Sequence, residues 1–195
     1  MDGILRFPIP KSYFVVGGLP EVVETALKHS HSQFEIFQEV RKKQSDLVNS
    51  YLADMAKHAG KVQRNALERI WSNIPNQLAK SIDGASEKFV FKGVIPGIKG
   101  YERMVGAIDW LIKAGLVIKI PLVDGALHPL TAFTKENTFK LFLFDIGILG
   151  SLANLDAQSI MGYDYGSYKG YFAENYVLQE LRALGERVFS WKENE

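Results

Sequence analysis

Glu174 is the acidic residue whose surroundings most suggest chemistry. It lies in a predicted amphipathic helix over residues 169–182, between Phe172 and Tyr176. Mg²⁺ prefers hard oxygen ligands from several carboxylates, so Glu174 could join a metal site that other residues complete. Glu180 lies six residues further along and faces another side of the helix, so the two cannot share a metal ion. The alternative is that Glu174 is an ordinary helix-surface residue.

A second group of candidate functional residues is basic. Lys92, Lys99, Arg103, Lys113 and Lys119 cluster around a predicted helix over residues 101–114 and the strand that follows it. If this surface met a DNA duplex, its basic side chains would mainly contact phosphates. The same helix also carries Glu102 and Asp109, whereas a helix that enters the major groove is usually more basic. A DNA-binding role and a protein-interaction role both stay open.

The composition argues against several classes of protein. The 195 residues carry a net charge of +1, so no overall field attracts nucleic acid or a membrane surface. The absence of cysteine excludes disulfides, thiolate catalysis and cysteine-rich zinc sites, and it is typical of a cytosolic protein. No apolar run approaches the ~20 residues that a membrane-spanning helix needs, and the N-terminus lacks a signal-peptide pattern. We therefore expect a cytoplasmic protein without a membrane partner.

The common catalytic motifs are also missing from the sequence. It contains no Gly-x-x-x-x-Gly-Lys-Ser/Thr phosphate loop, no His-Glu-x-x-His pair and no Gly-x-Ser-x-Gly elbow. We therefore expect no complete catalytic site, no metal site of its own and no cofactor bound by this chain.

The elements that must position these residues begin with an irregular stretch over residues 1–20, which prolines and glycines punctuate. Pro20 and Glu21 suit the first turn of a helix. The apolar spacing predicts one long helix from Gln33 to Ala59, with Gly60 as its stop.

The best-defined pattern covers residues 61–128. Apolar spacing predicts a helix from Val62 to Ile74, which Pro75 ends, and a second short helix from Pro75 to Ser81. The next predicted elements are a strand over 89–91, a helix over 101–114 and a strand over 116–121, after which Asp124-Gly125 predicts a tight turn into a returning strand. This order is typical of a winged helix-turn-helix.

The remaining residues predict a buried strand over 139–145, a short helix over 146–152, the helix over 169–182 and a strand over 187–191. A helix with one strand only opens an α/β unit, so we expect a piece of a longer protein. The last helix could pack back on residues 139–148, pair with a second copy of the chain, or fray. We favour the first arrangement, with Phe172 and Trp191 buried against Phe142 and Phe144. The inward face of the helix would then consist of Phe172, Tyr176, Val177, Leu181 and Leu184.

Six short motifs occur in an order that resembles a known family. They are Gly17-Gly-Leu-Pro-Glu21, Tyr51-Leu-Ala-Asp54, Ile74-Pro-Asn-Gln-Leu-Ala-Lys80, Ile108-Asp-Trp-Leu-Ile-Lys-Ala-Gly-Leu116, Lys140-Leu-Phe-Leu-Phe-Asp-Ile-Gly147 and Gly170-Tyr-Phe-Ala-Glu-Asn-Tyr-Val177. The chain resembles the C-terminal part of a large prokaryotic family of AAA+-type ATPases that carry an accessory domain of unknown function. In that family a P-loop domain precedes the Gly-Gly-x-Pro-Glu segment, and a winged helix follows it. A restriction-endonuclease-like domain, which begins with the Gly-x-x-x-Glu-Asn helix, comes last.

The resemblance implies that Glu174 is the first-helix acid of the nuclease-like fold, whose later acidic elements would follow residue 195. ATP and Mg²⁺ would belong to the P-loop domain of the full-length family members and not to this chain. The implied partner is that ATPase domain, and self-association through the C-terminal end is a further expectation.

These observations together predict a mainly helical fold with small β elements. We expect a helical segment over residues 1–60, a winged helix over 61–128 and an incomplete α/β nuclease-like region over 129–195. The expected function is a non-catalytic regulatory or interaction region of an AAA+-type ATPase. The alternative is a DNA-binding winged-helix module.

Overall fold

The computed structural model describes residues 11–28, 32–81, 88–125, 127–162, 164, 166 and 168–191. Its helices are α1 (Lys11–Val16), α2 (Pro20–Leu27), α3 (Gln33–His58), α4 (Lys61–Ser81), α5 (Val105–Lys113), α6 (Ile146–Leu152), α7 (Ala157–Gly162) and α8 (Tyr168–Ala183). The strands are β1 (Val117–Val123), β2 (Thr134–Leu143) and β3 (Ser190–Trp191), and two 3₁₀ turns are η1 (Tyr101–Arg103) and η2 (Leu130–Phe133). The predicted class, mainly helical with small β elements, is confirmed.

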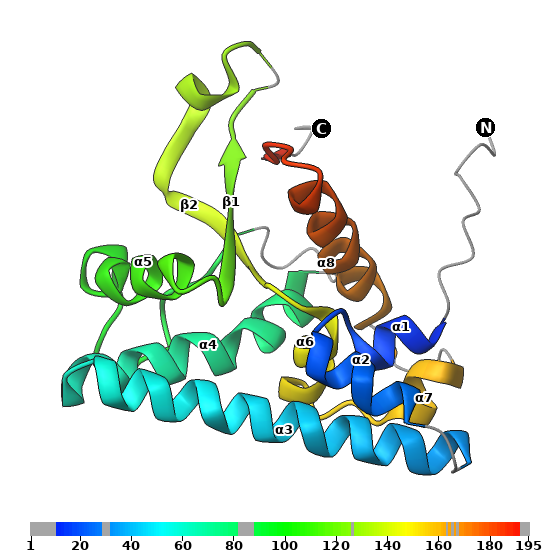
Figure 1. The fold of residues 1–195 in the computed structure, drawn as a ribbon. Coiled ribbons are helices and arrows are strands. Elements are labelled where there is room, and N and C mark those ends of the chain that lie inside the picture. The colour runs from blue at the N-terminus through cyan, green and yellow to red at the C-terminus, as the bar shows by residue number, and fades with distance from the viewer. Residues whose placement is uncertain are drawn as a thin grey trace.

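The longest helix, α3, forms the base of the molecule in Figure 1. Ser32 and Glu35 form a capping box at its start, because each side chain binds the other residue's backbone N–H. The helix ends at His58, one residue before the predicted end at Ala59, and Gly60 follows directly after its C-cap residue Ala59. Helices α1, α2, α6 and α7 gather around the N-terminal half of α3, whereas α4 and α5 lie over its other half (Figure 1).

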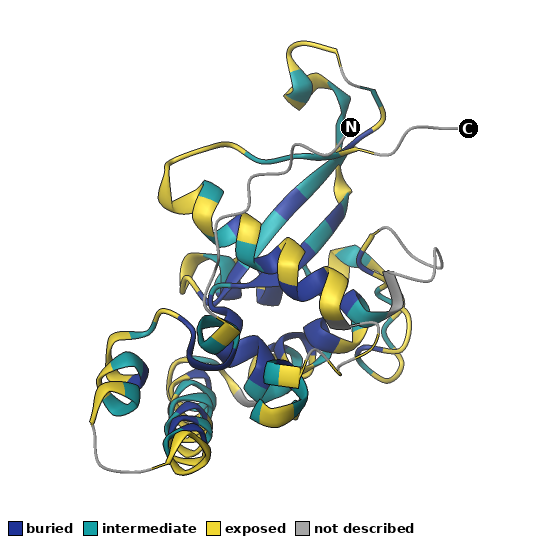
Figure 2. Ribbon diagram, turned by 90° about the vertical axis from the view of Figure 1, so that its right-hand side faces the viewer, coloured by how far each residue is buried: buried dark blue, intermediate teal, exposed yellow. Residues whose placement is uncertain are grey.

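A small mixed sheet rises from this helical base, with strand order β2-β1-β3. β1 and β2 are antiparallel, in a register that places Val117 opposite Leu143. β3 runs parallel to β1 and pairs with the C-terminal end of β1, where Leu122 lies opposite Ser190. Figure 2 shows that the sheet is buried near the helices and that the tip joining β1 to β2 is exposed.

The core lies where α4, α6 and α8 meet the C-terminal half of β2. Its largest fully buried side chains include Trp71, Phe139, Phe142, Tyr171 and Phe172. Figure 2 shows these elements as buried ribbon at the centre of the molecule. The predicted domain boundaries at residues 60 and 128 stay predictions. None of the helices in the described residues is both long and apolar enough to cross a membrane.

Helices α1 and α4 differ from the sequence prediction. Residues 11–16, predicted to be irregular, form α1, because Val15 and Val16 are buried against the neighbouring helices; residues 1–10 of the same prediction lie outside the described residues. The predicted break at Pro75 is wrong, since α4 continues through it to Ser81. Pro75 is itself buried between the buried side chains of Ile74 and Leu78. Packing on both sides of the proline outweighs the hydrogen bond that it removes.

The predicted winged-helix order also differs from the structure at three other points. Residues 89–91 form no strand, although the Phe89 N–H donates to the Phe139 carbonyl at 2.7 Å and the rings of Phe89 and Phe91 contact that of Phe139. The predicted helix over 101–114 is split into η1 and α5 at Met104, whose φ of −111° departs from that of a regular α-helix. Asp124-Gly125 makes no tight turn: residues 124–133, which include η2, separate the two strands.

The C-terminal helix packs back on the end of β2 and on α6, which confirms that part of the favoured arrangement. Phe172 is fully buried, but the inward face consists of Tyr171, Phe172, Asn175 and Leu178, while Val177 and Leu184 are exposed. The predicted burial of Trp191 is wrong, because its side chain is 51% exposed. The helix is rotated relative to the prediction because Asn175, a polar residue, points inward.

Candidate functional site: a groove beside helix α8

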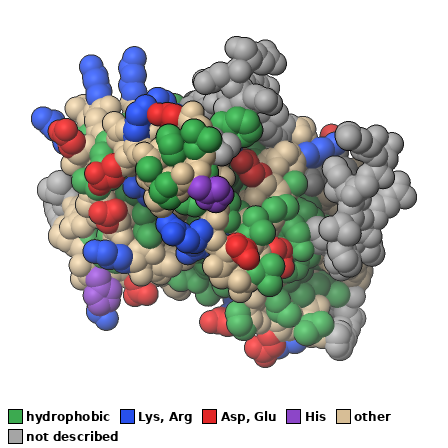
Figure 3. All heavy atoms as spheres, turned by 90° about the horizontal axis from the view of Figure 1, so that it is seen from above, with side chains coloured by type: hydrophobic (Ala, Val, Ile, Leu, Met, Phe, Trp, Pro, Cys, Tyr) green, Lys and Arg blue, Asp and Glu red, His purple; other side chains and the backbone are tan. Residues whose placement is uncertain are grey.

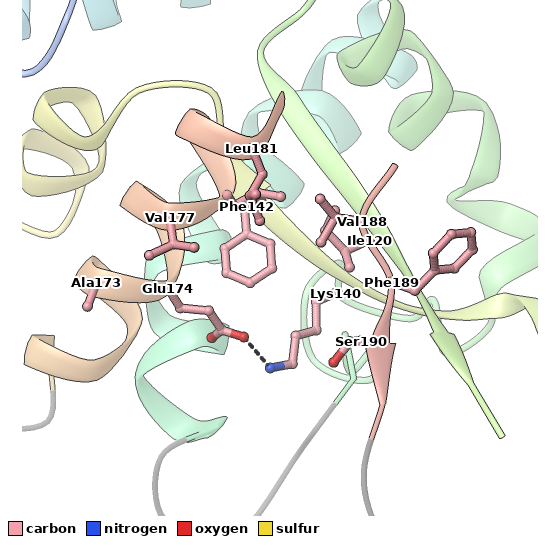
Figure 4. Close-up of a pocket in the computed structure, with 11 residues that line it drawn as sticks. Ile120, Lys140, Phe142, Ala173, Glu174, Val177, Leu181, Val188, Phe189 and Ser190 are labelled. Carbon is pink, nitrogen blue, oxygen red and sulfur yellow. Dashed lines mark hydrogen bonds and ion pairs between the residues drawn. The ribbon is translucent and has the colours of Figure 1, made fainter. Parts of the chain in front are cut away.

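Glu174 lies on the outer side of α8, because its neighbours Tyr171, Asn175 and Leu178 turn toward the core. Its carboxylate accepts a hydrogen bond from the Lys140 ammonium group of β2 at 2.7 Å. The Glu174 side chain is 44% exposed and the Lys140 side chain 16% exposed. Figure 4 shows this ion pair at the rim of a groove. The pair bridges helix and sheet at the surface.

The groove has a volume of about 330 Å³ and lies between α8 and the segment that leads into β3. Ile120 of β1 and Phe142 of β2 form its floor, as Figure 4 shows. The walls carry mostly apolar side chains, which include Val177, Leu178, Leu181, Val188 and Phe189. The groove therefore combines an apolar interior with one ion pair at its rim.

Asn175 fixes the position of α8 relative to the sheet. Its side-chain oxygen accepts a hydrogen bond from the Leu143 N–H at 3.1 Å, and its amide nitrogen donates to the Leu143 carbonyl at 3.0 Å. Asn175 is fully buried. The pair of hydrogen bonds holds the helix against the last residue of β2 and so places Glu174 and Val177 at the groove. In the sequence Asn175 stands out only as part of the Gly170–Val177 motif, and no residue pattern indicates this positioning role.

The described residues contain no group of three or more histidine, aspartate or glutamate side chains that could hold a metal ion. The Glu174 carboxylate is instead paired with an ammonium group. Its role as the acid of a nuclease-like fold stays a prediction.

The predicted basic residues are dispersed over different surroundings. The Lys119 ammonium group lies 4.4 Å from the centre of the Phe139 ring and 5.5 Å from that of Tyr101, so a cation–π contact engages it. Lys99 and Lys113 are exposed. Arg103 lines a hollow of about 700 Å³ together with Arg69 of α4. Arg69 is not among the basic residues that the sequence indicates as candidates. Figure 3 shows cationic side chains interspersed with acidic and hydrophobic ones on the face seen from above.

A buried polar centre joins α3, α6 and the turn between α1 and α2. Asp145 caps α6 by accepting the Ile148 N–H at 2.9 Å, and its second oxygen accepts the Gly18 N–H at 2.8 Å. Gly17 has a φ of +75°, and a Cβ there would lie 2.5 Å from the Asp145 carboxylate, so only glycine fits. Burial raises the pKa of Asp145, while its backbone hydrogen bonds oppose this shift. The Gly-Gly motif therefore has a structural role here.

The comparisons with known proteins give one family. Residues 10–159 match a domain of unknown function (DUF8612), and because this match covers most of the chain, the protein belongs to that family. No curated protein and no solved structure matches the chain. The matched range contains the buried polar centre and the sheet's β1 and β2, and it ends before α8.

Proposed function

We propose that the chain is a non-catalytic interaction or regulatory region of a prokaryotic AAA+-type ATPase. The groove beside α8 would receive an apolar segment of the ATPase partner. The observation that carries this proposal is the composition of the groove, with its apolar floor of Ile120 and Phe142 and the Lys140–Glu174 pair at its rim. The choice of partner rests on the family resemblance of the six sequence motifs.

The arrangement suits a partner that inserts one or two apolar side chains. Interface anchors bind in well-packed apolar pockets, and a polar rim sets their orientation. Val177, which is 52% exposed, offers a partner an accessible apolar wall. The ion pair can exchange one of its contacts for a charged group of the partner, because Glu174 is partly open to solvent.

A matched pair of variants tests this function. The rate of ATP hydrolysis by the P-loop domain of an AAA+-type ATPase of this family, taken from the same organism, should change when the chain is added. Val177→Asp should abolish the change, because it places a charge in the apolar groove. Leu127→Asp is the control, since Leu127 is 64% exposed and lies outside the groove. Equal effects of the two variants, or an ATPase rate that never responds to the chain, would refute the proposal.

A second measurement separates an interaction region from a nucleotide-binding enzyme. Calorimetric titration of the chain with ATP and Mg²⁺ should give no binding heat, because the sequence has no phosphate loop. Micromolar affinity for ATP would contradict the proposal.

The alternative function is DNA binding, in keeping with the predicted winged helix. The observation that favours it is the hollow between α4 and α5, where Arg69 and Arg103 lie together. Binding led by phosphate contacts should weaken steeply with salt, by a slope of about −0.9 per phosphate in a plot of log K against log salt. Arg69→Glu with Arg103→Glu should abolish duplex retardation in a gel-shift assay at low salt. The control is Lys57→Glu, an exposed residue of α3. No retardation by the unaltered chain would exclude this function.

A further inference from the structure

A second hollow, at the opposite end of the molecule from the tip of the sheet, is lined by a partly buried cation, Arg41. It has a volume of about 640 Å³ and lies between the first half of α3 and helix α7. This volume falls within the range of roughly 300–1,000 Å³ that small-molecule sites occupy. Phe34, Phe37 and Met161 supply apolar surface, and Gln38 and Gln158 supply side-chain amides.

Arg41 is the charged residue of this pocket whose hydrogen bonding is incomplete. Its Nη1 donates to the Gln44 side-chain oxygen at 2.7 Å and to the Gly147 carbonyl at 3.1 Å. Its Nε and Nη2 atoms are buried and have no hydrogen-bond partner among the described residues. These two nitrogens form one edge of the guanidinium group, the edge that binds both oxygens of a carboxylate in a fork. A buried donor without a partner is costly, so a ligand that supplies acceptors is favoured.

The charge of Arg41 is also incompletely neutralised. Burial lowers the pKa of its guanidinium group to about 10, while Asp156 and Asp145 oppose the shift, so the group is cationic at neutral pH. Both carboxylates have other hydrogen bonds: Asp156 accepts from Ser159, and Asp145 caps α6. Neither forms an ion pair with Arg41 in the described part of the chain.

We propose that the pocket between α3 and α7 binds a small organic monoanion, an aromatic carboxylate, with Arg41 as its charged anchor. The apolar wall of Phe34, Phe37 and Met161 would hold the ring. A single cation next to Asp156 favours one negative charge over the two of a phosphate monoester, because Asp156 would repel the second. In this structure the Nε and Nη2 atoms are closed off from the pocket, and a Cβ at Gly150 of α6 would lie 2.8 Å from Nη2. Binding therefore requires that the Arg41 side chain turns from α6 toward the pocket and exchanges its Nη1 contacts with Gln44 and Gly147 for the carboxylate.

The probe that tests this site is indole-3-acetate, with the neutral indole-3-acetamide as its isosteric control. Calorimetric titration of the full chain should show millimolar or tighter binding of the acid and binding of the amide that is weaker by about tenfold or more, as expected when a charged hydrogen bond is lost. No binding of the acid, or equal binding of acid and amide, would overturn the proposal.

Replacing Arg41 itself would also remove its hydrogen bonds to Gln44 and Gly147, so two variants at other residues test the site. Gln158→Glu places a second carboxylate at the exposed wall of the pocket and should weaken binding of indole-3-acetate about tenfold. Gln63→Glu, an equal charge change at an exposed residue of α4 outside this pocket, should leave binding unchanged. Binding that is the same in Gln158→Glu and in the unaltered chain would also overturn it. The site is separate from the groove beside α8, so its failure leaves the proposed function standing.

Discussion

Replacing Asn175 tests whether its hydrogen bonds hold α8 in place. In Asn175→Ala the buried N–H and C=O of Leu143 lose their partners, which lie at 3.1 and 3.0 Å in the unaltered chain. Each unsatisfied buried group costs about 1–3 kcal/mol, and the space left by the amide adds to this. We therefore expect the free energy of unfolding to fall by about 3 kcal/mol, a large share of the stability of a small domain.

The neighbouring variant Glu174→Ala provides the contrast. It removes a partly exposed ion pair with Lys140, and such pairs contribute at most about 1 kcal/mol. Urea unfolding followed by tryptophan fluorescence measures both variants, because Trp71 is fully buried and reports on the core. The reasoning is wrong if Asn175→Ala costs less than Glu174→Ala, or if the two variants lose equal stability. The comparison also requires that the slope of the free energy of unfolding against urea concentration is the same in both variants and in the unaltered chain.

Four further variants test the packing of the helices and the buried carboxyl group of Asp145. Gly147→Ala should lower the free energy of unfolding by about 2 kcal/mol, since its Cβ would lie 2.5 Å from the Val16 carbonyl oxygen. Gly106→Ala, with open space around it, should raise the free energy of unfolding by about 0.5–1 kcal/mol. Equal thermal midpoints for the two variants would contradict this. Pro75→Ala should raise the free energy of unfolding by about 1 kcal/mol, because it restores a backbone donor inside α4, and the urea midpoint should rise accordingly. A lower midpoint would show that the proline ring is needed for packing. Burial raises the pKa of Asp145 above 3.8, so the folded chain binds this proton more tightly than the unfolded chain. The contribution of Asp145 to stability should therefore decrease as the pH rises through its raised pKa. Urea midpoints measured across this pH range should show that Asp145→Asn lacks the decrease; a difference between the two proteins that does not vary with pH would refute it.

The local elements were largely predictable from the sequence. Apolar spacing and the stop at Gly60 located α3 to within a residue, and the same reasoning found α6, α8 and most of β1. These elements depend on interactions between near neighbours in the chain, such as caps, helical spacing and β-branched runs, which a sequence displays directly.

The sequence also identified Glu174 as a surface candidate but could not pair it with Lys140, which lies 34 residues away along the chain. Nor could it show that Asn175 rather than Val177 faces inward, because the hydrogen bonds of Asn175 go to a strand and not to its own helix.

What the sequence alone determined about this protein is its mainly helical class, the position of its long helices and the absence of cysteine chemistry and of a phosphate loop. The tertiary structure decided the rest: that α4 runs through Pro75, that β3 joins β1 in parallel, and that Nε and Nη2 of Arg41 are buried without a hydrogen-bond partner among the described residues. The physical reason is that these features depend on contacts between distant segments. Burial and hydrogen bonding there outweigh the local preferences that the residue pattern records.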